Sequence, residues 1–460
     1  MRCRLLPAVL FLIAVCSRFC SAADWPQFRG FYGNGITEDE FPLKWDAETN
    51  VRWKVDIPGE GWSAPVVWDN KLFLTVAIMT KKPPAEPQPA PDRALQRGRG
   101  NRPQGGRRGR RGRYKNNISS AEFRWEIRCL DTDTGDLIWK RVVREGNPTQ
   151  GHHLQNTYAT ETPITDGERV YAYFGMNGLY CCNMDGEPVW ENDPGSFVMR
   201  NDWGTSSSPV LYDDMLYLQI DSQEQSFLAA FDAETGDQIW RMDRDEPSQY
   251  SSPVIWRNSV RAELVTSGKV ARSYDPESGK LLWQLDLSGG RSSATPLAVG
   301  DRLYVGSEVR NRGSEGGGGY LFAVKAGAKG MIVSGDTNSV AWSQPRSGIQ
   351  MASPVLCKGH LYLFERRRGV LHCISADTGE MVYEERVPGA RAFWSSPWVL
   401  RDKVFCLDDE GATHVIQGGS DFRVLHTNQL DEQVWSTPAI ADGAVFIRTR
   451  ESLYCIASRS

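Results

Sequence analysis

The segments LDTDTGDLIW (130–139), FDAETGDQIW (231–240) and YDPESGKLLW (274–283) repeat one pattern along a chain of 460 residues. Each segment has an acidic residue, a turn that contains Gly, and a short run that ends in Trp. A glycine turn between two runs rich in apolar and aromatic residues predicts two antiparallel strands joined by a tight connection. The segment SADTGEMVY (375–383) keeps the pattern with Tyr in place of Trp. The chain therefore contains an internal β-repeat.

A second signature gives the number of repeats. A small residue or a hydroxyl residue precedes a proline that is followed by aliphatic residues, as in SSPVL (207–211), and an alternating strand such as RVYAYF (169–174) comes next. With the two strands around the glycine turn, each repeat has four strands, which is the content of a propeller blade. We therefore predict an all-β fold, an eight-bladed β-propeller of four-stranded antiparallel blades. The eight signature prolines are Pro65, Pro163, Pro209, Pro253, Pro296, Pro354, Pro397 and Pro438.

The two ends of the chain predict how the ring closes. After Pro438 the sequence has strands near 444–449 and 452–458, and it stops one strand short of a complete blade. The segment VRWKVD (51–56), which carries Trp53, has the character of the missing fourth strand. Pairing this N-terminal strand with the last blade would remove the exposed sheet edges of an open array.

The first 23 residues have the features of an export signal. Arg2 and Arg4 precede an apolar stretch (5–15), and Ser21-Ala22-Ala23 forms a site for cleavage. We predict a signal peptide at 1–23 and a single propeller at 24–460. The mature protein is expected to be soluble and monomeric, without a transmembrane segment, in the periplasm or outside the cell.

The segment 81–117 differs from the rest of the chain in composition. It has nine Arg and three Lys against Glu86 and Asp92, a local charge of +10 in a chain of net charge −4. Such a segment cannot bury apolar surface and predicts a disordered Arg/Gly/Pro-rich insertion within blade 1. Its charge would attract a polyanion or the acidic body of the protein itself. The simpler alternative, which we favour, is a solvated loop with no dedicated partner.

A Thr-Gly turn followed by a tryptophan on the next strand, repeated around a ring, resembles the pyrroloquinoline-quinone (PQQ) repeat family and its tryptophan-docking motif. The opening DWPQFRGFYGNGI (24–36) resembles the lead-in of exported bacterial members. The resemblance implies packing between blades by the fourth-strand tryptophans. The family includes quinoprotein dehydrogenases and non-catalytic propellers, among them an accessory lipoprotein of the outer-membrane β-barrel assembly machinery, so fold alone does not choose function. The tryptophans concerned are Trp53, Trp139, Trp190, Trp240, Trp283 and Trp342.

The dehydrogenase alternative requires residues that are hard to find in this sequence. Family alcohol dehydrogenases hold a vicinal disulfide over PQQ, which draws attention to Cys181-Cys182. However, the aligned slot of other repeats also holds small residues, so we favour buried packing for these cysteines. Glu161 and Asp202 lie where a calcium ligand would point inward, but no matching set accompanies them. The pair His152-His153 is favoured as a solvated turn. We therefore assign no catalytic residue, no metal ligand and no cofactor, and PQQ with calcium applies only if the alternative holds.

One alignment column predicts a binding site. The residue three positions before each signature proline should enter the central channel, and in the neighbouring blades 7, 8 and 1 it is tryptophan. This aromatic wall predicts a site for a small ligand or an envelope protein. The alternative, given equal weight, is that these rings plug the channel and pack on one another. The candidate residues are Trp62, Trp203, Tyr250, Arg291, Arg391, Trp394 and Trp435.

Two functions remain open from the sequence. We favour a non-catalytic propeller of the cell envelope that acts as a protein-interaction or ligand-binding scaffold. The alternative is a PQQ-dependent quinoprotein oxidoreductase, of the alcohol or sugar dehydrogenase type, with an atypical site. Saturable binding of PQQ with turnover would separate the two.

Overall fold

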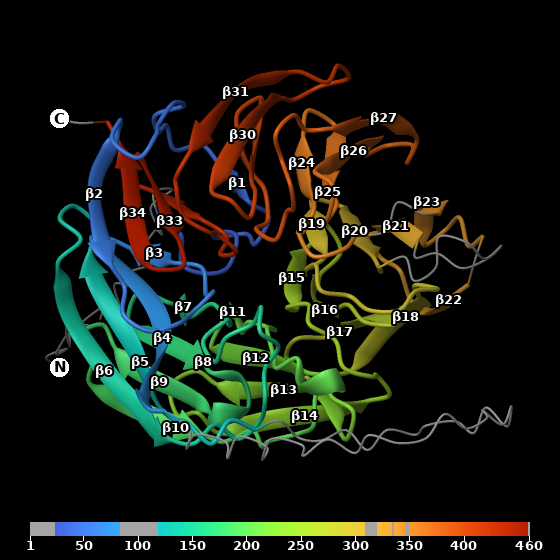
Figure 1. The fold of residues 1–460 in the computed structure, drawn as a ribbon. Helices are drawn as coiled ribbons and strands as arrows, with labels where there is room; N and C mark the ends of the chain where they lie inside the picture. The colour runs from blue at the N-terminus through green and yellow to red at the C-terminus, as the bar shows by residue number, and fades with distance from the viewer. Residues whose placement is uncertain (1–23, 83–117, 309–319, 334, 346–348, 459–460) are drawn as a thin grey trace, which may run out of the picture.

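The protein forms eight β-sheets arranged as blades around a central axis, as predicted (Figure 1). The computed structural model describes residues 24–82, 118–308, 320–333, 335–345 and 349–458. The predicted signal peptide and nearly all of the predicted basic insertion lie outside these residues. Within the described ranges, no helix has the length and apolar character needed to cross a membrane.

Each blade begins with a short strand at the axis and ends with a strand at the rim. Blades 1 and 2 contain β3 (Val66–Trp68), β4 (Lys71–Lys81), β5 (Glu122–Asp131), β6 (Leu137–Gly146), then β7 (Ile164–Thr165), β8 (Arg169–Tyr173), β9 (Leu179–Asn183) and β10 (Pro188–Asn192). Blades 3 and 4 contain β11 (Val210–Tyr212), β12 (Met215–Ile220), β13 (Ser226–Asp232), β14 (Gln238–Arg244), then β15 (Val254–Arg257), β16 (Ala262–Thr266), β17 (Val270–Tyr274) and β18 (Leu281–Asp286). 

The second half of the ring continues in the same order. Blades 5 and 6 contain β19 (Leu297–Val299), β20 (Arg302–Gly306), β21 (Tyr320–Lys325), β23 (Val340–Pro345), then β24 (Val355–Cys357), β25 (His360–Phe364), β26 (Val370–Ser375) and β27 (Met381–Arg386). Blades 7 and 8 contain β28 (Trp398–Leu400), β29 (Lys403–Leu407), β30 (Ala412–Gln417), β31 (Val424–Gln429), then β32 (Ala439–Ala441), β33 (Ala444–Arg448) and β34 (Ser452–Ala457).

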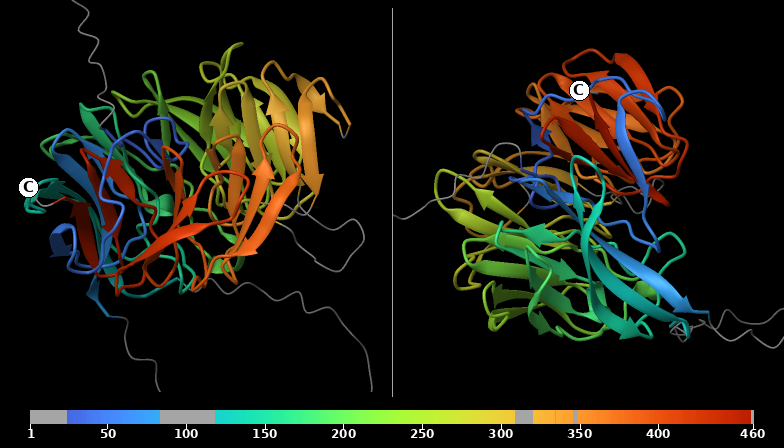
Figure 2. Two further views of the ribbon diagram at one scale, coloured as in Figure 1. Left: turned by 90° about the horizontal axis from the view of Figure 1, so that it is seen from above. Right: turned by 90° about the vertical axis from the view of Figure 1, so that its left-hand side faces the viewer.

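The N-terminal strand β2 (Val51–Asp56) completes blade 8 and closes the ring. It pairs antiparallel with β34, and Trp53 lies opposite Cys455. In the right-hand view of Figure 2 the blue strand lies beside the red strands of the last blade. The predicted closure is therefore confirmed.

Two blades gain a fifth strand that the repeat pattern did not predict. The segment after Ala326 contributes β22 (Gly330–Ile332), which pairs parallel with the rim strand β18. The strand β1 (Ile36–Thr37) pairs parallel with the axial strand β28. Both additions cover backbone groups at sheet edges, which would otherwise be open to pairing with other chains.

Five of the six fourth-strand tryptophans hydrogen-bond to the following blade. The indole Nε1 of Trp53 donates to the carbonyl oxygen of Thr132 at 2.9 Å, and the ring lies on Gly135. Gly135 has φ +76°, and a Cβ there would lie 2.8 Å from the ring, so both backbone conformation and space require glycine. The other four pairs are Trp139 with Gly186, Trp190 with Gly236, Trp240 with Gly279 and Trp342 with Gly379.

Trp283 departs from this pattern. Its Nε1 donates to the Glu263 carboxylate of its own blade at 2.7 Å, although the ring still packs among apolar residues of blade 5. Among the described residues between the third and fourth strands of blade 5, no glycine lies against the Trp283 ring, because the longer segment with β22 occupies the place of the short turn. The next blade therefore lacks the carbonyl that the other five tryptophans use.

Candidate binding site in the central channel

The eight residues of the predicted channel column line a single cavity of about 410 Å³. They reach the cavity because each lies just before an axial strand, where the chain enters the channel. The arrangement brings the tryptophans of blades 7, 8 and 1 onto one side. The eight residues are Trp62, Thr160, Ser206, Tyr250, Ser293, Met351, Trp394 and Trp435.

A second ring of eight residues lines the cavity, at the position immediately before each signature proline. Seven of them carry a hydroxyl, and at six junctions a backbone N–H donates to the hydroxyl of the next blade, as from Ser396 to Thr437 at 2.9 Å. Ala64 is the one member without a hydroxyl. These hydroxyl residues can be read from the sequence, but only the structure shows that they link neighbouring blades. We call this ring of hydrogen bonds the hydroxyl belt. The other five bonds join Ala64 to Thr162, Thr162 to Ser208, Ser208 to Ser252, Thr295 to Ser353 and Ser353 to Ser396.

The N-terminal segment crosses the channel next to the axial strands. Trp25 exchanges two backbone hydrogen bonds with Val67 of blade 1, each 2.9 Å long. Phe28 lines the cavity, and the buried guanidinium of Arg29 donates to the carbonyl of Pro354 in blade 6. The chain then reaches blade 7 through β1. This segment precedes the first repeat, so the repeat alignment gave no sign of it.

The three channel tryptophans form a stack. The Trp435 ring centroid lies 4.9 Å from that of Trp62 and 5.2 Å from that of Trp394, with interplanar angles of 40° and 29°. All three side chains are half-buried. Since both faces of Trp435 are covered by neighbours, mainly ring edges remain for a ligand. The Trp435 Nε1 is buried and has no hydrogen-bond partner among the described residues.

A second aromatic pair lines the cavity near blades 2, 3 and 4. Trp203 and Tyr250 have ring centroids 6.1 Å apart, and the Arg291 guanidinium lies 4.6 Å from the Trp203 centroid. Burial raises the pKa of the Tyr250 phenol, whose hydroxyl finds no hydrogen-bond partner within the described residues. The guanidinium of Arg291 is held by Glu308 at 2.7 Å.

Arg391 differs from the other six candidates because it does not line the cavity. Its side chain is 66% exposed and forms an ion pair with Glu410. Two arginines that the column missed, Arg366 and Arg367, line the cavity instead. They come from the turn between β25 and β26, and turns of this kind vary in length between blades, so no alignment column marks them.

The loop between blades 1 and 2 contributes His153, Gln155 and Asn156 to the cavity. The Asn156 Nδ2 donates to the carbonyls of Trp203 at 2.8 Å and Thr205 at 3.0 Å, which fixes the loop on the wall. The described part of the chain contains no group of three or more His, Cys, Asp or Glu placed to hold a metal. The His152-His153 pair therefore has no further ligand beside it.

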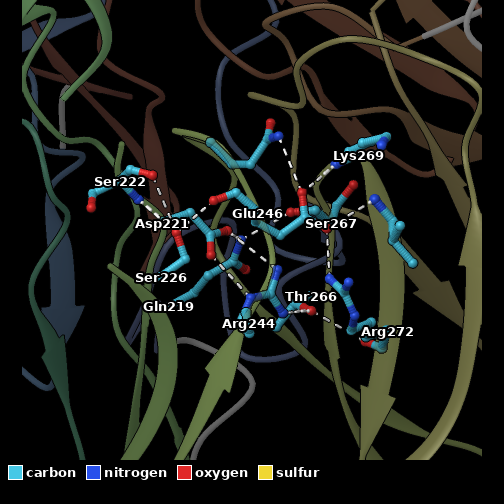
Figure 3. Close-up of polar contacts among 12 residues, drawn as sticks. Gln219, Asp221, Ser222, Ser226, Arg244, Glu246, Thr266, Ser267, Lys269 and Arg272 are labelled. Carbon is cyan, nitrogen blue, oxygen red and sulfur yellow. Dashed lines mark hydrogen bonds and ion pairs between the residues drawn. The ribbon is translucent and has the colours of Figure 1, made fainter. Parts of the chain in front are cut away.

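A buried polar network supports the cavity wall between blades 3 and 4 (Figure 3). Arg244 and Asp221, both at most 1% exposed in their side chains, pair at 3.0 Å, and Glu246 pairs with Arg272 at 2.6 Å. The Ser267 hydroxyl extends the network by donating to the Ser292 hydroxyl at 2.9 Å, beside Arg291. These charges are satisfied by one another, so they position the wall instead of facing a ligand.

The residues present do not fit a calcium and quinone site. Cys181 and Cys182 are free and buried, and they pack in different apolar clusters because neighbouring side chains of a strand point to opposite faces. Glu161 is buried away from the cavity lining, and burial raises its pKa to about 7. Neither it nor Asp202 joins a cluster of acidic ligands in the described residues. No catalytic step through PQQ is therefore derived.

Comparisons with known proteins agree with the fold. The relatives are an outer membrane assembly factor on one side and enzymes on the other. The model of the family described as outer membrane protein assembly factor BamB matches residues 124–308. BamB of Yersinia pestis is 22% identical over 338 residues, which are 65% of this chain and 81% of the relative. Tetrathionate hydrolase of Acidithiobacillus ferrooxidans is 22% identical over 216 residues, 41% of this chain but only 38% of that protein.

A solved structure gives the most complete overlap of these comparisons. A europium-containing methanol dehydrogenase superposes with a TM-score of 0.60 over 95% of this chain and 98% of its own, at 9% identity. At this identity the likeness concerns the propeller architecture alone.

Proposed function

We propose that this chain, which belongs to the PQQ-like β-propeller repeat family, is a non-catalytic binding propeller of the cell envelope whose central channel holds a ligand or a segment of a partner protein. The observation that carries the proposal is the cavity of about 410 Å³ with its aromatic wall. Concave sites that combine aromatic side chains with a few polar groups are typical ligand sites. The export signal predicted at 1–23 and the similarity to an outer membrane assembly factor support an envelope location.

The chemistry of the lining supports binding over catalysis. Among the described lining residues there is no Asp, Glu or Cys, so no carboxylate or thiol is available there as base or nucleophile. His153 is present, but its ring packs against Trp203 at 6.2 Å between centroids. The polar groups that the lining presents are hydroxyls, amides and guanidinium groups, which suit recognition of a ligand.

Affinity capture from envelope extracts tests the proposal. Wild-type protein is compared with the double variant Trp394→Ala/Trp435→Ala, and with Tyr32→Ala as a control for loss of an exposed aromatic residue, since Tyr32 is 61% exposed and outside the cavity. We expect the double variant alone to lose specific partners or bound small molecules, identified by mass spectrometry. An unchanged set would show that the channel is not the binding surface.

A titration tests the quinoprotein alternative directly. Purified protein is mixed with PQQ and calcium, and alcohols and sugars are assayed with an artificial electron acceptor. We expect no oxidation of alcohols or sugars, because the described residues lack the calcium ligands that a quinoprotein dehydrogenase needs, whether or not the carboxylates of PQQ bind in the channel. Saturable binding with turnover would replace the proposal by the oxidoreductase.

A further inference from the structure

The charge of the cavity lining has one sign. Arg291, Arg366 and Arg367 line it together with His153, and no carboxylate occurs among the lining residues that the structure describes. Arg291 lies just before the axial strand of blade 5, and Arg366 and Arg367 lie in a turn of blade 6, next to the tryptophan stack that begins in blade 7. This local charge contrasts with the chain as a whole, whose net charge is −4.

Arg291 is already neutralised. Its Nε and Nη2 donate to the same Glu308 oxygen at 3.1 and 2.7 Å, and both side chains are about one quarter exposed or less. Its guanidinium also lies 4.6 Å from the Trp203 ring centroid. Arg291 therefore contributes little uncompensated charge to the cavity.

Arg366 is different because its guanidinium has no ion pair and no hydrogen-bond partner in the described ranges. It is half-buried and lies 5.5 Å from the centroid of Trp394 at the end of the tryptophan stack. Burial lowers its pKa, as do the like charges of Arg367 and Arg291, while Glu308 opposes this from a distance. A desolvated cation beside other cations is unfavourable until an anion joins it.

A second arginine without a carboxylate partner, Arg448, differs from Arg366 because its guanidinium has hydrogen-bond acceptors within the protein. Arg448 is buried without a carboxylate, but its Nη1 donates to the Ser63 hydroxyl at 2.6 Å and to the Thr75 carbonyl at 2.9 Å. These bonds tie blade 8 to blade 1. Arg366 has no comparable bonds, and its guanidinium faces a cavity instead of a blade junction.

We propose that the channel is an oxyanion receptor in which the Arg366 guanidinium binds a carboxylate or phosphate of the ligand, with Arg367 and the Trp394 ring beside it. This inference rests on the proposed function and names the chemistry of the ligand. The planar fork of arginine matches both oxyanions through two parallel hydrogen bonds. The free ring edges of the stack carry positive partial charge and are compatible with an anion.

Titration with two simple probes tests the inference. Glutarate supplies a carboxylate and inorganic phosphate a tetrahedral oxyanion, each added at low salt while tryptophan fluorescence and heat of binding are recorded. We expect saturable binding of at least one probe, with a change in emission because Arg366 lies against Trp394. Saturation by glutarate alone, by phosphate alone or by both assigns the source and supports the receptor.

Arginine variants decide whether the binding belongs to this site. Arg366→Gln should weaken the probe about tenfold or more, since hydrogen bonds to charged groups contribute roughly 1.5–3 kcal/mol. Arg391→Gln removes a rim arginine outside the cavity and should bind as wild type does. Arg366→Lys keeps the charge but loses the fork and should lie between them. Thermal unfolding of each variant checks that the fold is retained.

Two outcomes overturn the receptor. One is the absence of saturable binding for both probes, and the other is equal affinity of Arg366→Gln and wild type. Neither affects the capture experiment with the tryptophan variants, so the channel would remain a binding site for an uncharged ligand. Conversely, unchanged partners in that capture would remove the proposed function even if glutarate or phosphate bound at Arg366.

Discussion

The tryptophans at the rim and those in the channel are the same residue in two different settings. At the rim, Trp53 lies on a glycine turn of the next blade and donates its indole N–H to a carbonyl. In the channel, Trp435 stacks between two other indoles, and its N–H has no partner within the described chain. The rim tryptophans recur at most blade junctions, whereas the three stacked channel tryptophans lie in the adjacent blades 7, 8 and 1.

This difference separates residues that build the fold from residues available for function. A tryptophan that recurs with each repeat and satisfies its polar atom stabilises the junction between blades. The stacked channel tryptophans occupy the column position of only three blades, so the junctions between blades do not in general require them. We therefore expect substitutions at the rim to change stability, and substitutions in the channel to change binding.

The largest effect should come from the rim residue that closes the ring. Trp53→Ala should lower the free energy of unfolding by about 3–5 kcal/mol, since it removes a buried indole at the junction of the two chain ends. Trp53→Phe retains most of the packing and loses the hydrogen bond to Thr132, so about 1 kcal/mol is expected. Urea unfolding measures both. Equal losses would mean that packing contributes little at this junction.

A buried carboxyl behind the channel wall gives the next effect. Burial raises the pKa of Glu161 from 4.5 to about 7, so the folded protein holds this proton more tightly than the unfolded chain. The stabilisation is complete below pH 4.5 and is lost as pH rises through 7, a change of about 3 kcal/mol.

The neutral isostere Glu161→Gln should remove this pH dependence and make the protein more stable than wild type at pH 8. Unfolding free energies between pH 4.5 and 8 test this, with Glu410→Gln as an exposed control that should keep the wild-type slope. Parallel curves for wild type and Glu161→Gln would exclude the raised pKa.

Two glycines with the same backbone conformation separate the role of the rim contact from that of the turn. Gly186 has φ +81°, and a Cβ there would lie 2.6 Å from Trp139; Gly389 has φ +82° and open space around it. Both Ala variants incur backbone strain, but only Gly186→Ala meets the indole. We expect it to be less stable than Gly389→Ala by about 1–3 kcal/mol in urea unfolding. Equal stability would contradict close packing of the tryptophan on the turn.

The smallest effect concerns the hydroxyl belt of the channel. Ala64→Ser should supply the missing hydroxyl and accept from the backbone N–H of Thr437, raising the unfolding free energy by about 0.5–1 kcal/mol. Ser396→Ala removes a hydroxyl that accepts from Ser353 and should lower it by a similar amount. A loss of stability in Ala64→Ser would show that the junction of blades 8 and 1 has no room for the belt to close.

The repeat made much of the fold predictable. Strand pairing of Trp53 with Cys455 and the channel column follow from counting repeats, because equivalent positions of each blade have equivalent geometry. The additional strands β1 and β22 come from segments outside the repeat, so the repeat pattern could not predict them.

Only the tryptophan side of the candidate site could be predicted from the sequence. The tryptophan stack lies in the repeat column, but Arg366 and Arg367 come from a turn and Phe28 from the segment before the first blade. Arg391 was predicted to belong to the channel site, yet its exposed side chain forms an ion pair with Glu410 and does not line the cavity. Spacing along the chain locates strand residues, whereas turn residues depend on local contacts.

Urea unfolding of Trp394→Ala distinguishes a ligand wall from a structural plug most directly. Trp394 is half-buried and stacks on one neighbouring indole, so its removal should lower the free energy of unfolding by about 1 kcal/mol, well below the loss for Trp53→Ala. A loss of about 3–5 kcal/mol, equal to that of the rim residue, would show that the channel tryptophans are core packing and would contradict a binding wall.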